Sequence, residues 1–249
     1  MRRFVVVLSI LMTVPLVFVA CGGGGGGGGG GSVGPALTVF EGDWFGPGDD
    51  GALAPFTIGL TMDSSGGLST YERDGSPVLL TTPATFVVED ASSARITFAD
   101  MTEGGLFWDD GVEHILFVDT WTEAVAVVEK NAAVLPSYVA SDGVGSWTGY
   151  AYAFDFGTGD FEKESPVNLT VANDLSFAGT DPQNNPFTGS FDGALFSGSH
   201  GMYFGTIDGP PEQAIQIFLS PDLTFSGGVL WEAGAVWPEE YVIVVLTKQ

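Results

Sequence analysis

Four aromatic residues near the middle of the chain have the types and spacing of a binding surface. Trp147 is followed by Tyr150, Tyr152 and Phe154, and the positions between them hold the small residues Gly149, Ala151 and Ala153. Because side chains alternate between the two faces of a strand, the three later rings share one face, and the small residues share the other with Trp147. An outward stripe of rings could stack on sugars or pack against a partner domain. We therefore predict Tyr150, Tyr152 and Phe154 as candidate ligand contacts, with burial inside the protein as the alternative.

The residues that most often perform catalysis are few and are not spaced for it. His114 and His200 are the only histidines, they form no His-x-x-x-His pair, and Cys21 is the only cysteine. Zinc sites combine several such side chains, so the sequence predicts no metal site. Ser199 precedes His200, and adjacent residues on a strand would point to opposite faces, which excludes a nucleophile–base contact. The chain also has no Gly-x-Ser-x-Gly turn and no phosphate-binding loop. We expect no catalytic residue, no cofactor and no enzyme activity.

Carboxylates dominate the charge of the chain. There are 31 acidic residues and 7 basic ones, which gives a net charge of −24. Pairs such as Asp49-Asp50 have the groups that glycoside hydrolysis needs, but a chain this acidic offers such pairs by chance. The stretch 155–160 (DFGTGD) lacks the regular spacing of a calcium loop and is typical of a hairpin turn. Phosphate contacts need Lys and Arg, so the charge excludes nucleic acid as a partner and favours a role in solubility or cation binding.

The start of the chain has the pattern of an export signal. Met1-Arg2-Arg3 is positive, and 4–20 is an uncharged, mostly apolar stretch that ends on a small residue before Cys21. These three features are typical of a secretory signal. The run from Phe18 to Cys21 resembles a bacterial lipoprotein signal, with Phe18 in place of the usual Leu. The resemblance implies cleavage before Cys21, which becomes the mature N-terminus, and lipidation of Cys21, palmitate included. An ordinary cleaved signal or an uncleaved anchor is the alternative.

A run of glycines separates Cys21 from the rest of the chain. Gly22–Gly31 is unbroken glycine, and a flexible coil of this length has its ends about 17 Å apart. We expect a disordered tether between a lipid anchor and a folded body. In bacterial lipoproteins, an Asp directly after the lipidated cysteine resembles the signal that keeps the protein in the inner membrane. Its absence here favours the outer membrane, with the periplasmic or the surface face left open. Cleavage would remove Arg2 and Arg3 and take the net charge from −24 to −26.

The pattern after the tether is that of β-strands. Apolar residues alternate with others in several short runs, and no long run has the 3.6-residue period of a helix. Examples of the alternating runs are 58–62 (IGLTM), 167–171 (VNLTV) and 215–219 (IQIFL). Turn signals such as Asp74-Gly75 and Asp208-Gly209 lie between the runs. Short strands at regular spacing with such turns predict antiparallel strands in a sandwich or barrel.

The two halves of the body are similar to one another. Gly42-Asp43-Trp44 opens the first half and Gly145-Ser146-Trp147 opens the second. The halves also close alike, on 121–130 (WTEAVAVVEK) and 237–248 (WPEEYVIVVLTK). A Gly-x-Trp start before a meander of short strands resembles the lipocalin-like and avidin-like barrels. In that family the tryptophan plugs one end of the barrel, which implies this role for Trp44 and Trp147. Eight strands enclose room for side chains or for one small ligand.

These signals divide the chain into five parts. A signal peptide occupies 1–20, the lipidated cysteine and tether 21–34, a first barrel 35–131, a linker 132–143 and a second barrel 144–249. The predicted fold class is all-β, with two tandem antiparallel meander barrels. One merged β domain is the alternative. We expect each half to have its own core and to fold separately.

The predicted function follows from this plan. A membrane-anchored bacterial envelope lipoprotein with β-barrel domains is expected, acting as a non-enzymatic binding module for a small apolar molecule or a glycan. A structural or adhesive envelope protein without a small ligand is the alternative. The expected partners are the membrane, through the lipid on Cys21, and the small ligand. The sequence leaves the identity of the ligand and the oligomeric state open.

Overall fold

The structure is a computed structural model, and it describes most of the body of the protein. The described residues are 35–51, 53–78, 84–98, 103–108, 111–120, 124–155, 161–181, 183–209, 212–232 and 240–249. The predicted signal peptide, Cys21 and the tether lie outside these residues. Gly34–Gln249 forms one compact unit. Within the described residues, no helix has the length and apolar character needed to cross a membrane.

The first half is a closed antiparallel barrel. Its strands are β1 (Gly42–Asp49), β2 (Phe56–Met62), β3 (Gly67–Arg73), β4 (Ser76–Pro77), β5 (Ala84–Val88), β6 (Ser93–Thr97), β7 (Glu103–Trp108), β8 (His114–Asp119) and β9 (Ala124–Lys130). The order is β2-β1-β9-β8-β7-β6-β5-β3-β4, and a further pairing of β2 with β3 closes a ring of eight strands. The two-residue strand β4 pairs with β3 and stays outside the ring. A 3-10 turn, η2 (Leu37–Phe40), precedes β1.

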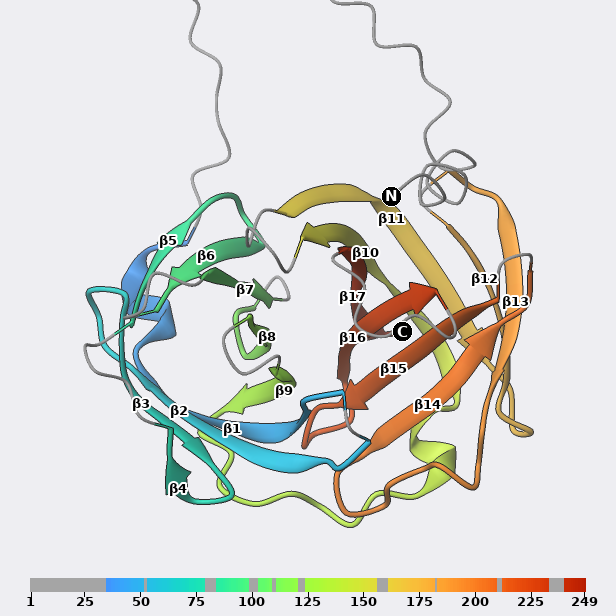
Figure 1. The fold of residues 1–249 in the computed structure, drawn as a ribbon, viewed down its shortest axis with the longest axis horizontal. Coiled ribbons are helices and arrows are strands. Elements are labelled where there is room, and N and C mark those ends of the chain that lie inside the picture. The colour runs from blue at the N-terminus through green and yellow to red at the C-terminus, as the bar shows by residue number, and fades with distance from the viewer. Residues whose placement is uncertain are drawn as a thin grey trace, which may run out of the picture. The chain divides into compact units, whose positions relative to one another are not determined.

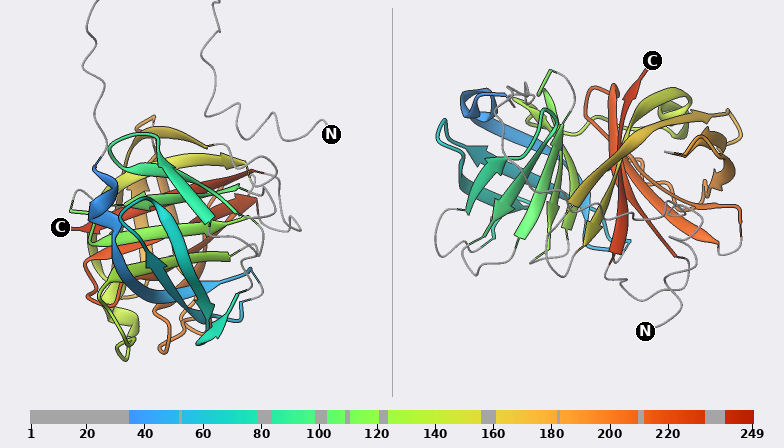
Figure 2. Two further views of the ribbon diagram at one scale, coloured as in Figure 1. Left: turned by 90° about the vertical axis from the view of Figure 1, so that its left-hand side faces the viewer. Right: turned by 90° about the horizontal axis from the view of Figure 1, so that it is seen from above.

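The second half is a closed barrel of eight strands in sequence order. They are β10 (Gly145–Asp155), β11 (Phe161–Val171), β12 (Ser176–Thr180), β13 (Pro186–Phe191), β14 (Met202–Ile207), β15 (Gln213–Leu219), β16 (Phe225–Glu232) and β17 (Glu240–Lys248). Each strand pairs antiparallel with the next, and β17 returns to β10. Another 3-10 turn, η3 (Ala140–Gly143), precedes β10. Figures 1 and 2 show the two barrels side by side, the first in blue to green and the second in yellow to red.

Alternation of side chains explains the interior of each barrel. In β2, Phe56, Ile58, Leu60 and Met62 are buried, and the residues between them are half-buried. This is the pattern of a strand with one face in a core. The interior of the first barrel is one apolar cluster that runs from Phe40 to Val128 along the chain. The interior of the second is another, and it includes Tyr138 from the predicted linker.

A third apolar cluster joins the barrels. In β8 all six residues are buried, because Ile115 and Phe117 face the interior while Leu116 and Val118 face the other barrel. We call this third group the inter-barrel cluster. Its members are Phe107, Leu116, Val118, Val125 and Val127 of the first barrel and Tyr152, Phe154, Met202, Phe218, Phe225, Val229, Tyr241, Ile243 and Val245 of the second.

The prediction of an all-β fold with two tandem antiparallel barrels is confirmed. Strands β1–β9 fall within 35–131, and β10–β17 fall within 144–249. Packing of the outward stripe against a partner domain, which the sequence left open, is observed for Tyr152 and Phe154. Separate folding of the halves stays a prediction, and the inter-barrel cluster shows what each half would expose if it were alone.

Candidate functional site

The two predicted plug residues occupy equivalent places in the two barrels. Trp44 and Trp147 are buried, with 1% and 2% of their surface exposed. The indole Nε1 of Trp44 donates to the carbonyl oxygen of Phe40 at 2.9 Å, and that of Trp147 donates to Gly143 at the same distance. A lysine ammonium from the last strand of each barrel lies 5.6 Å and 5.2 Å from the respective ring. Each tryptophan therefore anchors the 3-10 turn at the start of its barrel.

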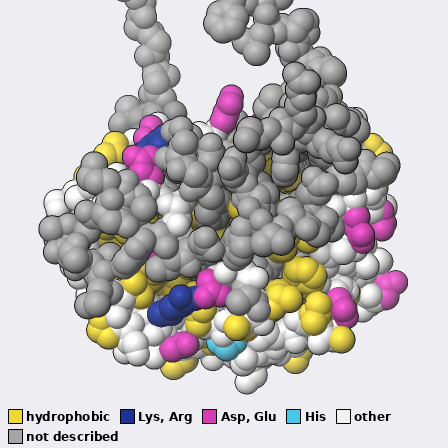
Figure 3. All heavy atoms as spheres, viewed as in Figure 1, with side chains coloured by type: hydrophobic (Ala, Val, Ile, Leu, Met, Phe, Trp, Pro, Cys, Tyr) yellow, Lys and Arg dark blue, Asp and Glu magenta, His cyan; other side chains and the backbone are white. Residues whose placement is uncertain are grey.

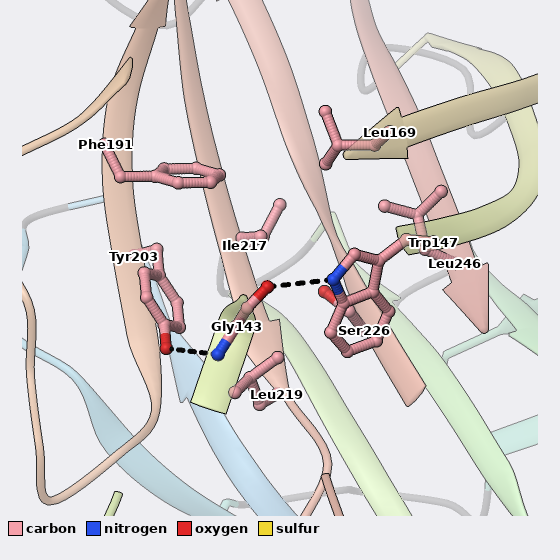
Figure 4. A pocket seen from close by; sticks show the side chains of 9 residues that line it. All are labelled: Gly143, Trp147, Leu169, Phe191, Tyr203, Ile217, Leu219, Ser226 and Leu246. Carbon is pink, nitrogen blue, oxygen red and sulfur yellow. Dashed lines mark hydrogen bonds between the residues drawn. The ribbon is translucent and has the colours of Figure 1, made fainter. Parts of the chain in front are cut away.

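The interior beside Trp147 is packed. Side chains that include Phe191, Tyr203 and Ile217 surround the indole, and the space between them does not admit a water-sized sphere (Figure 4). Tyr203 accepts a hydrogen bond from the Gly143 backbone N–H at 2.8 Å. Burial raises the pKa of Tyr203 to about 12, so its hydroxyl is neutral at physiological pH. At this end the second barrel is filled by its own side chains and has no room for a ligand.

The aromatic stripe of β10 points outward, as its alternation predicts. Ala151 belongs to the interior of the second barrel, whereas Tyr152 and Phe154 belong to the inter-barrel cluster. Their rings lie 4.5 Å and 6.3 Å from that of Phe107 in the first barrel. Both are only 1% exposed, so neither offers a surface to a dissolved ligand. Tyr150 is 40% exposed, and it is the one residue of the predicted stripe that faces solvent.

An open groove lies beside Tyr150, where the two barrels meet. It has a volume of about 510 Å³ and is lined from the first barrel by Ser92 and Trp108, among others. The second barrel contributes Thr148, Tyr150, Lys163 and Gln249. We call this space the inter-barrel groove. Its lining combines ring and aliphatic surfaces with hydroxyl, amide and ammonium groups, which are the components of a small-molecule site.

Lys163 is the centre of the polar contacts in the groove. Its Nζ donates to Ser92 Oγ at 2.6 Å and lies 3.8 Å from the ring centroid of Tyr150. Ser92 Oγ is also 2.9 Å from the hydroxyl of Tyr152. Burial raises the pKa of Tyr152, so this hydroxyl stays protonated. Lys163 thus links Ser92 of the first barrel to the aromatic face of Tyr150 in the second.

Other contacts fix the walls of the groove. Trp108 Nε1 donates to the carbonyl oxygen of Ala91 at 2.9 Å, and the indole is buried. The side-chain amide of Gln249 donates to Thr148 Oγ1 at 2.7 Å. These bonds orient the side chains of Trp108 and Gln249 in the lining.

Positive charge is scarce at the surface, and each of the five basic residues in the described part of the chain has a contact. Arg73 lies 2.5 Å from Asp50 and Arg95 lies 2.7 Å from Glu103. Lys130 and Lys248 donate to backbone carbonyls beside the two tryptophans. On the face shown in Figure 3, acidic side chains are scattered over the described surface, and the few basic ones lie beside them. Lys163 is thus the single basic side chain that lines the groove.

The prediction that Ser199 and His200 point to opposite faces of a strand is wrong. Ser199 and His200 lie in a turn, not in a strand, and Ser199 Oγ is 2.8 Å from His200 Nδ1. Burial lowers the pKa of His200, and the carboxylates of Asp74 and Asp49 act in the opposite direction. The contact joins neighbouring residues in an exposed loop. Ser92 and Lys163 were missed altogether, because they come from different barrels and are 71 positions apart.

Comparisons with known proteins give only distant structural similarity. No family model matches the chain, and no curated protein does. A protein of unknown function from the DUF3598 family of Nostoc punctiforme is 11% identical, with a TM-score of 0.34, over 87% of this chain and 100% of that one. Transferrin binding protein B from Neisseria meningitidis is 8% identical, with a TM-score of 0.39, over 84% of this chain and 43% of that one. A double mutant of the protein of the same name from Haemophilus parasuis is 10% identical, with a TM-score of 0.29, over 78% and 65%. These values are too low to carry a conclusion about function.

Proposed function

We propose that the protein is an exported, lipid-anchored envelope protein whose body binds a neutral glycan in the inter-barrel groove, without catalysis. The groove, with Tyr150 exposed on its wall, is the observation that carries the proposal. Anchoring through Cys21 rests on the lipoprotein-like leader. The outer membrane is its proposed location.

The chemistry of the lining favours a sugar over a purely apolar molecule. Sugars present apolar ring faces, which stack on aromatic side chains, and hydroxyls, which pair with polar ones. Tyr150 supplies the ring, while Ser92, Lys163 and Gln249 supply hydrogen-bonding groups. The net charge of −24 favours a neutral guest, because it repels anions at long range.

The groove also replaces the barrel interior as the proposed site. The sequence expectation placed a small ligand inside a barrel, but the space beside Trp147 is filled. A role without a small ligand, structural or adhesive, is the second candidate, and this packing favours it.

Glycan titration of the full-length protein in detergent tests the proposal. Neutral oligosaccharides would be added while intrinsic fluorescence and heat are followed, and we expect saturable binding. Tyr150→Ala should weaken it by about 2- to 10-fold, the loss of one stacked ring. Leu195→Ala is a matched control, because Leu195 is 41% exposed and does not line the groove. Wild-type protein that shows no saturable change with any neutral sugar would leave the structural or adhesive role as the better account.

The non-enzymatic part of the proposal has a separate test. Ser92 is the hydroxyl that a serine-directed fluorophosphonate would label if Lys163 acted as its base. We expect no labelling of Ser92 by mass spectrometry. Covalent labelling that disappears in Lys163→Met would contradict us and make the groove an active site.

A further inference from the structure

A second cluster of side chains links the barrels, and none of its members lines the inter-barrel groove. His114 and Glu129 are cross-strand partners in β8 and β9 of the first barrel. Asp222 lies in the turn between β15 and β16 of the second barrel. One nitrogen or oxygen atom from each of the three lies within 4.8 Å of the other two. Within this cluster, His114 Nε2 is 3.1 Å from Asp222 Oδ1.

The three side chains are held in place by their neighbours. The His114 imidazole is buried and stacks on Phe225, with 5.2 Å between ring centroids and 9° between ring planes. The carboxylate of Asp222 accepts hydrogen bonds from Ser220 Oγ at 2.6 Å and from Thr224 Oγ1 at 2.7 Å. The Asp222 backbone N–H donates to Glu129 Oε2 at 2.9 Å. Such contacts around a group of ligands fix their orientation before an ion arrives.

The electrostatics of the cluster favour a cation. The carboxyl groups of Glu129 and Asp222 lie together beside the imidazole of His114, where their like charges would repel one another. A divalent ion between them would relieve the repulsion.

We propose that His114, Glu129 and Asp222 bind one divalent transition-metal ion, best matched by Zn²⁺, which joins the two barrels. One imidazole nitrogen and two carboxylate oxygens are ligands that Zn²⁺ accepts, and water completes the fourth position. Ca²⁺ and Mg²⁺ prefer sets made of oxygen alone, so the histidine argues against them. The side chain of Asp222 is 38% exposed, which leaves solvent a path to the site.

The distances are compatible with this ion after a small adjustment. Zn²⁺ holds nitrogen and oxygen ligands at about 2.0–2.2 Å, so ligand atoms in a tetrahedron are roughly 3.3–3.6 Å apart. The His114–Asp222 distance of 3.1 Å is already close to this spacing. The remaining separations, at most 4.8 Å, must close by about 1 Å. Rotation of the longer Glu129 side chain supplies such a movement.

Metal titration of the full-length protein, stripped with a chelator and then dialysed, tests the proposal. Calorimetry with ZnCl₂ should show one ion bound per chain, and MgCl₂ should give no saturable heat. The melting temperature should rise by about 5–10 °C when free Zn²⁺ exceeds Kd about a hundredfold. His114→Gln and Asp222→Asn should each lower the affinity by at least about 10-fold, the smallest loss expected for removal of a ligand. His200→Gln, at the other histidine of the chain, is the matched control and should bind as the wild type does.

A spectroscopic readout covers the case in which His114→Gln does not fold. The wild-type chain has two histidines, so ¹⁵N resonances of the imidazoles can be assigned with the His200→Gln variant. Zn²⁺ should shift the ring nitrogens of His114 and leave those of His200 unchanged. Absence of saturable Zn²⁺ binding, or binding that shifts only His200, would overturn the proposal. The cluster would then be only a polar contact between the two barrels.

Discussion

The first strands of the two barrels agree on their inner faces and differ on their outer faces. Counted from Trp44 and Trp147, the next inward positions are Gly46 and Gly149. A Cβ on either glycine would lie within 2 Å of a backbone oxygen of the last strand of its barrel, at Val127 or Val245. Both barrels thus require the same small residue, because β1 and β10 approach β9 and β17 closely.

The outward positions have diverged. Pro47 and Asp49 stand in the first barrel where Tyr150 and Tyr152 stand in the second. Tyr152 enters the inter-barrel cluster and Tyr150 lines the inter-barrel groove. Asp49 is buried as Tyr152 is, but its side chain is a carboxyl group rather than an aromatic ring. Closure of the barrel therefore constrains the residues of the inner face, whereas the residues of the outer face differ between the two halves.

The largest effect on stability is expected when the two halves are expressed separately. Residues 132–249 alone keep the interior cluster of the second barrel, Tyr138 included, but expose Tyr152, Phe154 and Phe225. We expect the fragment to give a β-type circular dichroism spectrum, to melt cooperatively and to self-associate. Its free energy of unfolding should be lower than that of the full chain by about 5 kcal/mol or more, because each large apolar side chain contributes about 1.5–3 kcal/mol when buried. Urea denaturation and gel filtration measure this. A monomeric fragment as stable as the full chain would show that the inter-barrel cluster contributes little.

Removal of either plug tests whether the two barrel ends are equivalent. Trp44→Ala and Trp147→Ala should each cost about 3–5 kcal/mol, because each leaves a cavity and removes an anchor of a 3-10 turn. Chemical denaturation followed by circular dichroism gives the free energy of unfolding. Val134→Ala is the control, because Val134 is 75% exposed. A neutral effect at one tryptophan and a large one at the other would break the equivalence.

The paired glycines allow a finer test. Gly46→Ala and Gly149→Ala should each destabilise the fold by about 1–3 kcal/mol, because the added methyl group meets backbone that cannot move aside easily. Gly59→Ala is a matched control in β2, where the nearest atom to an added Cβ is 3.7 Å away. The melting temperature should fall for the first two variants and stay close to the wild type for the third. Equal effects at all three positions would assign the loss to strand propensity alone.

The smallest expected effect is a pH dependence of stability that comes from the buried carboxyl of Asp49. Burial raises the pKa of its carboxyl above the ordinary 3.8, and the nearby charge of Asp50 acts in the same direction. The folded state therefore holds this proton more tightly than the unfolded state does, and the free energy of unfolding decreases as pH rises above 3.8. Asp49→Asn should remove this part of the pH dependence. Melting curves of variant and wild type at a series of pH values should diverge as pH rises, and parallel curves would contradict the argument.

Much of the fold follows from local patterns in the sequence. The alternation in 58–62 predicts an inward face of β2, and the Gly-x-Trp starts predict two equivalent barrel openings. The direction of the stripe after Trp147 also follows, because Ala151 and Tyr152 must face opposite ways. Such inferences need only the alternation of side chains between the two faces of a strand.

The site depends on contacts that no local pattern contains. Lys163 meets Ser92, and Asp222 meets His114, only because the outer faces of the two barrels pack together. Alternation shows that Tyr150 and Tyr152 point outward, but it cannot show that one is covered by Phe107 while the other stays exposed. That difference depends on where the first barrel lies against β10.

The short strand β4 affects whether copies of the protein can aggregate through the edge of the first sheet. In the described part of the chain, the order of the first sheet ends on Ser76–Pro77. A free sheet edge is a template on which amyloid-like growth can begin. This edge has only two residues, and Pro77 has no N–H to offer to an incoming strand. Fibril growth from this edge of the first barrel should therefore be disfavoured even at high protein concentration.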